Sequence, residues 1–135
     1  MSDIIVRKMQ PEDLLQVCEI EKDNFSLPWS EKSFLDSMER CDTVFLTAVV
    51  GEEVVGYLGC YCVAGEGEIT NVAVKSSHRR QGIGGKLLEQ LYEDAAALNT
   101  KEFFLEVRES NKVEVLSRLM DAHNFKLSVV LYVEA

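Results

Sequence analysis

Hydrophobic and polar positions in the first third of the chain predict one strand followed by two helices. Residues 3–9 form a β-branched apolar run typical of a strand. Residues 11–25 have helical periodicity, and Pro11 suits the first turn of that helix. Its apolar positions share one side: Leu14, Val17, Cys18 and Ile20. Residues 28–40 predict a turn and a second helix, for which Ser30 is a candidate N-cap.

The middle of the chain changes to a strand pattern and then returns to helical spacing. Residues 43–74 are rich in β-branched and aromatic residues, and glycines interrupt them at 51–52 and at 65–67. This pattern predicts three strands joined by hairpins. Residues 81–98 then predict a long amphipathic helix. Its apolar positions are Leu87, Leu88, Leu91, Tyr92, Ala95 and Leu98.

The last part of the chain predicts a strand, a helix and a final strand. The strands cover residues 101–108 and 125–133, and the helix covers 111–124 with Asn124 as a left-handed C-cap. Antiparallel hairpins followed by a strand–helix–strand crossover predict an α/β fold of the mixed α+β type. We expect one domain over residues 1–135, with a mixed, mostly antiparallel sheet covered by helices on both faces.

Composition and charge narrow the class of protein. The chain has 135 residues, 47% of them hydrophobic and 27% charged, which suits a globular protein with a substantial core. The net charge of −9 argues against nucleic-acid binding, because phosphate contacts require a basic face. No run reaches the roughly 18 apolar residues of a membrane span, and the first residues do not resemble a leader. We therefore expect a cytoplasmic protein with no membrane partner.

The four cysteines do not predict a disulfide framework or a metal site. Cys60 and Cys62 flank one residue in a strand-like run, so they fall on the same face at a spacing that disulfides do not favour. Cys18 and Cys41 are isolated. We expect reduced, packed thiols and no bound metal.

One short stretch of this acidic chain concentrates positive charge and glycine, namely HRRQGIGGKLLE at 78–89. It follows the strand that ends at Val74 and opens the helix predicted from residue 81. The first N–H groups of a helix have no partner within it, and the helix dipole favours negative charge there. Glycines let the backbone approach a ligand closely. The stretch therefore predicts an anion site, with a pyrophosphate as the candidate ligand.

Two other phosphate motifs do not match this stretch. A Walker A loop needs glycine where Arg80 stands and Ser or Thr where Leu87 stands, and a Rossmann fingerprint needs glycine at Leu87. For the glycines alone, a flexible turn with a solvated basic face is the alternative. The preceding strand favours the pyrophosphate site.

The same residues carry a family resemblance. The spacing Arg79-x-x-Gly82-x-Gly84, preceded by ITNVAV at 69–74, resembles the acetyl-CoA signature of the GCN5-related N-acetyltransferase (GNAT) family. The PWS at 28–30 and the LEVRESN at 105–111 resemble more narrowly the RimI type, the ribosomal-protein-alanine N-acetyltransferases. The resemblance covers roughly residues 3–111.

This resemblance implies the GNAT fold and acetyl-CoA as co-substrate. The turn at 79–85 would bind the CoA pyrophosphate through backbone amides, and the strand before it would pair with the pantetheine arm. That strand can also be a plain core strand, because the cofactor would use only its backbone. The implied cofactor-binding residues are Val72, Ala73, Val74, Arg79, Arg80, Gln81, Gly82, Ile83, Gly84, Gly85 and Asn111.

Glu106 is the candidate catalytic residue. It lies among apolar neighbours in FLEVR, where a carboxylate is costly unless it is paired or functional. The resemblance implies that Glu106 is the general base, acting through water; pairing with Arg108 is the alternative. A backbone N–H at the bulged end of the strand at 71–74 could polarise the thioester carbonyl.

The chain departs from the RimI type after Asn111. That type has a tyrosine general acid about a dozen residues beyond the glutamate, whereas Arg118 or Met120 stands there in this sequence. Tyr132 is the alternative proton donor. The chain ends ten residues after Phe125, so we expect a shortened C-terminal strand region without a seventh strand. An exposed sheet edge there predicts a homodimer formed through the terminal strand.

The resemblance implies acetyl transfer to a protein N-terminal α-amine, with the N-terminal alanine of bacterial small-subunit ribosomal protein eighteen as the expected acceptor. Phe25 and Trp29 would line the acceptor groove, although an ordinary aromatic staple explains them equally well. Two alternatives remain: a non-catalytic acyl-CoA-binding or interaction module, and a GNAT enzyme that acts on a small-molecule amine.

Overall fold

The protein is built around one sheet of six strands. The computed structural model describes residues 3–107 and 127–131, with side chains for residues 3–104. The strands are β1 Ile4–Lys8, β2 Thr43–Val50, β3 Glu53–Val63, β4 Glu66–Val74, β5 Glu102–Val107 and β6 Leu127–Leu131. They lie side by side in the order β1-β2-β3-β4-β5-β6.

Strand directions divide the sheet into an antiparallel and a parallel part. The pairs β1–β2, β2–β3 and β3–β4 are antiparallel, whereas β4–β5 and β5–β6 are parallel. Short hairpins join antiparallel neighbours, while the helix between β4 and β5 supplies the crossover that a parallel pair needs. The prediction of a mixed, mostly antiparallel sheet is confirmed, as are the three strands predicted within residues 43–74.

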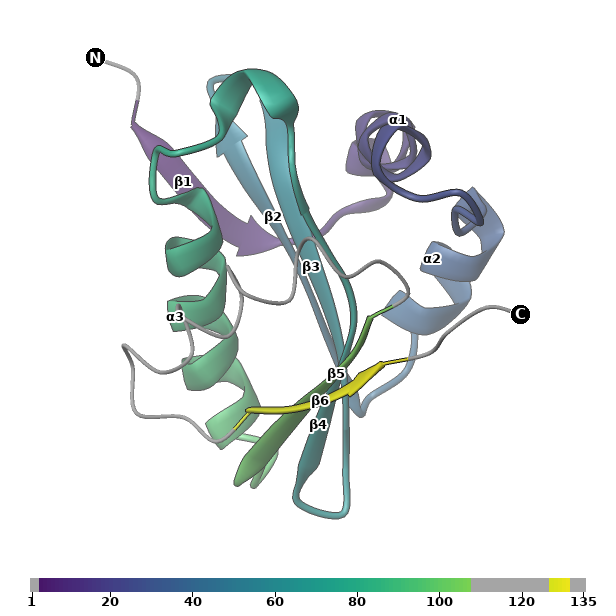
Figure 1. The fold of residues 1–135 in the computed structure, drawn as a ribbon, viewed down its shortest axis with the longest axis vertical. Coiled ribbons are helices and arrows are strands. Elements are labelled where there is room, and N and C mark those ends of the chain that lie inside the picture. Colours follow the sequence, from purple (N-terminus) through teal and green to yellow (C-terminus); the bar gives the residue numbers. More distant parts are fainter. Residues whose placement is uncertain (1–2, 108–126, 132–135) are drawn as a thin grey trace.

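Helices cover both faces of the sheet, as predicted (Figure 1). α1 Leu14–Asn24 and α2 Glu31–Met38 lie on one face, and α3 Ile83–Ala96 lies on the other. Two apolar clusters fill the layers between helices and sheet. The cluster beneath α3 includes Leu58, Ile69, Leu87, Leu88 and Leu91. The cluster beneath α1 and α2 includes Leu14, Val17, Phe34, Phe45 and Tyr57.

Two predicted helix starts are wrong, and each has a local cause. Residues 11–13 form a 3-10 turn before α1, because the Asp13 carboxylate accepts a hydrogen bond from the Gln10 N–H at 2.7 Å and closes a cap there. α3 begins at Ile83, not at residue 81, because Gly82 has a φ of 78°. The prediction for α2 is confirmed at its cap, where the Ser30 hydroxyl accepts a hydrogen bond from the N–H of residue 33 at 3.1 Å.

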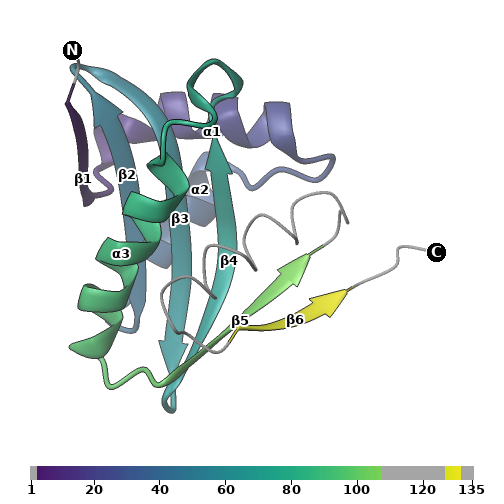
Figure 2. The same cartoon turned by 60° about the vertical axis from the view of Figure 1, so that its left-hand side comes forward.

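β4 and β5 diverge part-way along their length (Figure 2). Within the described residues their pairing ends at Ile69 opposite Leu105. A β-bulge lies at the same point, because the register of β4 against β3 shifts between Ile69 and Asn71 and leaves Thr70 as the extra residue. Bulges bend and twist the strand that contains them. β4 therefore turns away from β5, and within the described residues no strand pairs with its residues 70–74 on that side.

The cysteines are free thiols in different environments. Cys60 and Cys62 lie buried on one face of β3, as predicted, with 3.9 Å between their sulfurs. The hydrogen bond between the two thiols lowers the pKa of Cys62 to about 7 and raises the pKa of Cys60. The prediction of packed thiols is wrong for Cys41, which is exposed.

Two features are absent from the part of the chain that the structure describes. No helix there combines the length and apolar character needed to cross a membrane. No group of three or more His, Cys, Asp or Glu side chains in those ranges is arranged to hold a metal ion. β6 pairs with β5 along one side, and the homodimer through the terminal strand stays a prediction.

Candidate active site

The turn between β4 and α3 is compact and contains two residues with positive φ. Ser76–His78 form a 3-10 turn, after which Arg80 and Gly82 have φ values of 64° and 78°. Gly82 occupies the N-cap position of α3. A Cβ atom at Gly82 would meet nothing within 4 Å, so the backbone conformation, not lack of space, favours glycine there.

Backbone N–H groups at the start of α3 are free to bind an anion. The first hydrogen bond of this helix joins the Lys86 N–H to the Gly82 carbonyl at 3.1 Å. The N–H groups of Ile83, Gly84 and Gly85 therefore precede any acceptor within the helix. The helix dipole adds partial positive charge at the same end. This arrangement fits a phosphate or pyrophosphate group.

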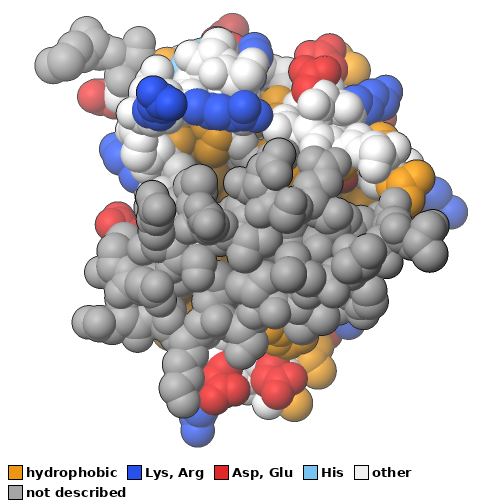
Figure 3. Space-filling model, in the orientation of Figure 1, with side chains coloured by type: hydrophobic (Ala, Val, Ile, Leu, Met, Phe, Trp, Pro, Cys, Tyr) orange, Lys and Arg blue, Asp and Glu red, His pale blue; other side chains and the backbone are white. Residues whose placement is uncertain are grey.

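Basic side chains surround this turn, but they are not equally available. Arg79 donates a hydrogen bond to Asn24 Oδ1 of α1 at 2.8 Å, and Lys75 is paired with a carboxylate of β3 at 2.6 Å. Arg80 and Lys86 are exposed. In Figure 3, Lys and Arg side chains form a blue row along the upper part of this face, directly above hydrophobic side chains. Positive charge thus gathers on one part of an acidic protein.

The second half of β4 has its side chains in the core and its backbone edge open. Ala73 is buried in the cluster beneath α1 and α2, whereas Val72 and Val74 pack against the cluster beneath α3. Ile83 is 2% exposed in the same cluster as these valines. Ala73 is buried and Val72 and Val74 are half-buried, so a ligand here would meet the backbone and the exposed parts of the two valines. This arrangement is compatible with the predicted pairing between β4 and a pantetheine arm.

β5 brings the backbone of Glu106 to the point where the two strands diverge. Glu106 follows Leu105, the last residue of β5 that pairs with β4 within the described ranges, and it pairs with Val130 of β6. Its backbone therefore lies directly after the last β4–β5 pair, where the two strands diverge (Figure 2). The catalytic role of Glu106 stays a prediction. The other predicted participants lie outside the described residues: Asn111, Arg118, Met120 and Tyr132.

The two aromatic residues predicted to line the acceptor groove pack into the protein. The Trp29 ring lies 5.2 Å from the Phe34 ring and 6.2 Å from the Phe45 ring, measured between centroids. Phe25 packs partly buried against the same cluster. These contacts are those of an aromatic staple, so both residues shape the segment between α1 and α2 from beneath. Leu27, which the sequence patterns did not single out, is 61% exposed on that segment.

A buried polar cluster lies under the same segment and was not predicted. Glu21 is 1% exposed, and its carboxylate accepts hydrogen bonds from Tyr57 Oη at 2.5 Å and from the Trp29 N–H at 2.7 Å. Asn71 Nδ2 lies 3.4 Å from each carboxylate oxygen. One signal was present in the sequence, because Glu21 stands seven residues after Leu14 on the buried side of α1, where a carboxylate is unusual.

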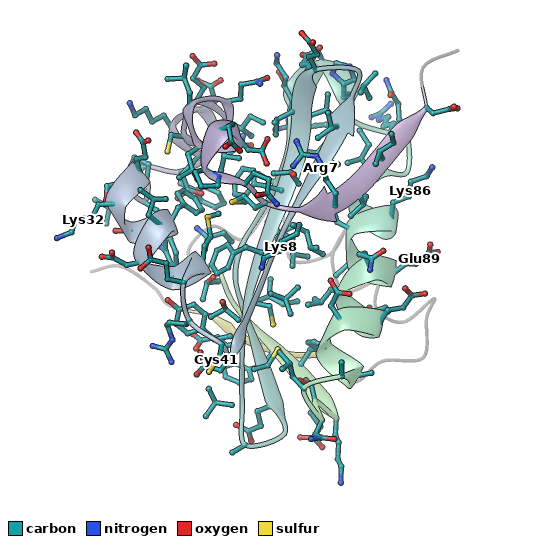
Figure 4. All side chains as sticks on the ribbon, turned by 180° about the vertical axis from the view of Figure 1, so that it is seen from behind. Arg7, Lys8, Lys32, Cys41, Lys86 and Glu89 are labelled. Atoms are coloured by element: carbon teal, nitrogen blue, oxygen red, sulfur yellow. The ribbon has the colours of Figure 1, made fainter. Side chains whose placement is uncertain are left out.

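A shallow groove of about 280 Å³ lies elsewhere, between β1 and α3. Ile4 and Val6 line its strand side, and Lys86 and Glu89 line its helix side (Figure 4). Because β2 and β3 separate β1 from β4 in the sheet, this groove is not part of the opening between β4 and β5.

Comparison with known proteins decides the family. The family model described as the acetyltransferase (GNAT) family matches residues 14–115, which contain α1 to α3 and β2 to β5. The chain belongs to the GNAT family. The expected GNAT fold and acetyltransferase class are therefore confirmed. As a GNAT enzyme, the protein is an acetyl-CoA-dependent N-acyltransferase.

Several relatives in the GNAT family are named for one acceptor. The [ribosomal protein bS18]-alanine N-acetyltransferase of Salmonella typhimurium (strain LT2) is 32% identical, over 76% of this chain and 69% of that protein. The protein of the same name in Escherichia coli (strain K12) is 30% identical, over 82% of this chain and 74% of that protein. An N-alpha-acetyltransferase of Saccharolobus solfataricus is 27% identical, over 96% and 84%. The predicted resemblance to the RimI type is confirmed.

Solved structures of GNAT proteins share the fold. The crystal structure of the Escherichia coli ribosomal-protein-S18-alanine N-acetyltransferase has a TM-score of 0.75 at 24% identity and covers 90% of this chain and 77% of its own. Ard1 from Thermoplasma volcanium has a TM-score of 0.78 at 23% identity, over 93% and 84%. At these identities the likeness establishes the fold and leaves the acceptor open.

Proposed function

We propose that this GNAT enzyme transfers an acetyl group from acetyl-CoA to the N-terminal α-amine of a protein, and that the N-terminal alanine of ribosomal protein bS18 is its acceptor. The observation that carries the proposal is the divergence of β4 and β5 directly after Ile69 and Leu105. Around this divergence lie the β4 edge that no described strand pairs with, the start of α3 where we propose that pyrophosphate binds, and the backbone of Glu106. The names of the relatives support an α-amine acceptor.

In this proposal, backbone groups hold acetyl-CoA. The N–H groups of residues 81–85 bind the pyrophosphate, and Arg79 and Arg80 add positive charge beside it. The open edge of residues 72–74 pairs with the amides of the pantetheine arm as a further strand would. Asn111 is a further proposed contact to that arm. When bound, acetyl-CoA supplies the thioester whose acetyl group is transferred.

The proposed reaction is a direct transfer with no covalent enzyme species. The neutral amine nitrogen forms a bond to the thioester carbonyl carbon, and the carbon–sulfur bond breaks. Glu106 accepts the amine proton through a water molecule, as a general base. A backbone N–H at the bulge near Thr70 polarises the carbonyl oxygen. The sulfur departs as a thiolate and takes up one proton, which balances the proton that Glu106 removed.

The pKa values of amines and of the leaving thiol favour an α-amine acceptor. An α-amine with a pKa of about 8 is roughly one-tenth neutral at pH 7, whereas a lysine amine with a pKa of about 10.4 is less than about 0.1% neutral. A thiol with a pKa of about 8.5 can leave unprotonated at a cost on the order of 2 kcal/mol. A site without a strong general acid therefore suits α-amines better than lysines. We place the reaction in the cytoplasm, where ribosomal proteins are made.

The test is an acetyl-transfer assay with three acceptors. The first is a peptide that begins Ala-Arg-Tyr, the second is the same peptide with a blocked N-terminus, and the third is a polyamine. We expect product on the free peptide only. Tight CoA binding without product on any acceptor would indicate a non-catalytic acyl-CoA-binding module. Product on the polyamine but not on the free peptide would assign the enzyme to small-molecule amines.

A further inference from the structure

Glu21 is a buried acidic side chain that the transfer chemistry does not use. It lies in the last turn of α1 and is 1% exposed. Among the ion pairs of the described residues, none involves this carboxylate. Burying a carboxylate without a cation is costly, and apolar residues often replace buried charges without loss of stability. Retention of this charge under the α1–α2 segment therefore needs an explanation other than packing.

The Glu21 carboxylate links three parts of the molecule on one face of the sheet. Its hydrogen-bond donors are the Trp29 N–H in the segment between α1 and α2, Tyr57 Oη on β3 and Asn71 Nδ2 on β4. Burial raises the pKa of Tyr57, and the adjacent charge of Glu21 raises it further. Tyr57 thus remains a proton donor to Glu21. The carboxylate fixes the α1–α2 segment relative to β4.

The same contact determines how the Asn71 amide is oriented. Asn71 Nδ2 lies 3.4 Å from both oxygens of Glu21, so a flipped amide would place its oxygen against a carboxylate. Asn71 Oδ1 must therefore face away from Glu21. This oxygen is buried and has no hydrogen-bond partner among the described residues, and Asn71 as a whole is 3% exposed. A buried acceptor without a partner costs about 1–3 kcal/mol.

Asn71 lies at the divergence of β4 and β5, where the proposed transfer reaction would take place. It directly follows the bulged Thr70 at the divergence of β4 and β5, and it directly precedes the edge of residues 72–74. A neutral primary amine has two N–H donors and one lone pair. Two hydrogen-bond acceptors that hold both N–H groups therefore point the nitrogen lone pair toward the thioester carbonyl carbon. Transfer requires this orientation of the amine. Water leading to Glu106 supplies one acceptor, and Asn71 Oδ1 is suited to be the other.

We propose that Asn71 Oδ1 binds an N–H of the acceptor amine and that Glu21 is a positioning residue, which orients Asn71 and holds the α1–α2 segment beside it. The inference rests on the proposed transfer to an amine. It does not depend on which amine is acetylated. It assigns to this enzyme an amine-binding residue on β4 in addition to the proposed base on β5.

The decisive variant is Asn71→Leu, which has nearly the same size but no acceptor oxygen. We expect kcat/KM for the acceptor to fall roughly 10- to 100-fold, with the Kd for CoA within about twofold of the wild-type value. The thermal midpoint should fall, because the variant also removes the Asn71 Nδ2 donor to the buried Glu21 carboxylate, so acceptor kinetics carry the test. A purely structural role of Asn71 would lower the midpoint in the same way but leave acceptor kinetics unchanged.

Glu21→Gln tests the positioning role. Its amide nitrogen would face another donor, either Tyr57 Oη or the Trp29 N–H, and Asn71 would no longer be held in one orientation. We expect the acceptor KM to rise severalfold, with CoA affinity unchanged. Ser37→Ala is the matched control, because it removes a buried hydroxyl contact to Tyr61 on the same face without touching Glu21. This control should leave acceptor kinetics at the wild-type level.

Binding and turnover together separate failure of this inference from failure of the proposed function. If wild-type protein acetylates only a small amine, the proposed acceptor is wrong, and loss of that activity in Asn71→Leu still supports the inference. The Kd of the Ala-Arg-Tyr peptide for the CoA-bound protein is measured by calorimetry as a readout that needs no turnover. Equal acceptor kcat/KM and equal peptide Kd in wild type and Asn71→Leu would overturn the inference. Absence of both turnover and acceptor binding in wild type would overturn both proposals.

Discussion

Arg79 Nη2 donates a hydrogen bond to Asn24 Oδ1 over 2.8 Å and so joins the turn before α3 to the end of α1. The last turn of α1 also carries Glu21, three residues earlier. One helix end therefore contacts both the turn proposed to bind pyrophosphate and the residues proposed to bind the acceptor. The two substrate sites are connected through α1.

Asn24→Ala removes the acceptor of the Arg79 hydrogen bond. The loss of one such bond is worth about 1 kcal/mol, so we expect the Kd for CoA to rise about fivefold. Isothermal titration calorimetry measures this change directly. An unchanged Kd would show that Arg79 needs no tether to α1 to support the turn.

Gly82→Ala places a Cβ on a residue with a φ of 78°. The left-handed conformation costs a non-glycine residue about 1–2 kcal/mol, so the turn before α3 should relax and bind CoA more weakly. Gly51→Ala is a matched control, because Gly51 also has a positive φ, of 62°, with open space around it, but lies in the β2–β3 hairpin. Both variants should lower the thermal midpoint. Only Gly82→Ala should weaken CoA binding, and equal CoA affinity in the two would contradict the prediction.

Glu106→Gln tests the general base. Removal of a general base typically costs roughly 10²- to 10⁴-fold, so we expect kcat to fall within that range while the Kd for CoA is unchanged. Steady-state kinetics with the free peptide provide the measurement. In wild type, kcat/KM should also rise with pH as the acceptor amine loses its proton. Full activity in Glu106→Gln would exclude this residue as the base.

The contacts of the Asp13 carboxylate predict that the free energy of unfolding falls at acid pH. Burial raises its pKa, but hydrogen bonds from Arg7 at 2.7 and 2.8 Å and from the Gln10 N–H outweigh burial and hold the pKa below its ordinary value of 3.8. The stabilisation is complete above the unfolded-state pKa and is lost as the pH falls through the lower folded-state pKa. Urea unfolding should therefore show a free energy of unfolding that falls below about pH 4.

Asp13→Asn should weaken the dependence of the free energy of unfolding on pH. At pH 7 it should reduce the free energy of unfolding by about 1–2 kcal/mol, since the Arg7 partner is 40% exposed and partly screened. The matched control is Asp42→Asn, which breaks the exposed pair with Arg40 and should change the free energy much less. Equal losses in the two variants would contradict the assigned role of Asp13.

The terminal strand predicts self-association. β6 has a partner strand only on its β5 side within the described ranges, and sheet edges tend to pair with other chains. We expect a dimer at micromolar concentration in light scattering after size-exclusion chromatography. A monomer across the measured concentration range would remove the terminal strand as an interface.

Periodicity was sufficient to predict the layers of the fold. The β-branched and aromatic residues of 43–74 predicted three strands because glycines mark the two hairpins, and Leu87, Leu88 and Leu91 marked the buried side of α3. Helix starts were less predictable. The cap between Gln10 and Asp13 is local, but Asp13 also binds Arg7 on β1 and Thr47 on β2, and local patterns do not report such contacts.

The part of the candidate site that depends on backbone geometry could be predicted from the sequence. Glycines after a strand indicated the turn before α3, because only backbone geometry is needed there. The Glu21–Asn71 contact spans fifty residues, so no local pattern contains it. The exposure of Leu27 in the α1–α2 segment was not predicted either, and Phe25 and Trp29 are half-buried there.

The open edge of β4 has a consequence for the stability of the enzyme in a cell. A ligand that pairs with this edge supplies hydrogen bonds that no described strand makes to residues 70–74 on the β5 side. Such a ligand raises the free energy of unfolding by RT ln(1 + [L]/Kd), about 2.7 kcal/mol at one hundred times Kd. If acetyl-CoA fills this role, the lifetime of the folded enzyme rises and falls with the supply of its own substrate. Nutrient starvation would then lower the amount of enzyme as well as its rate.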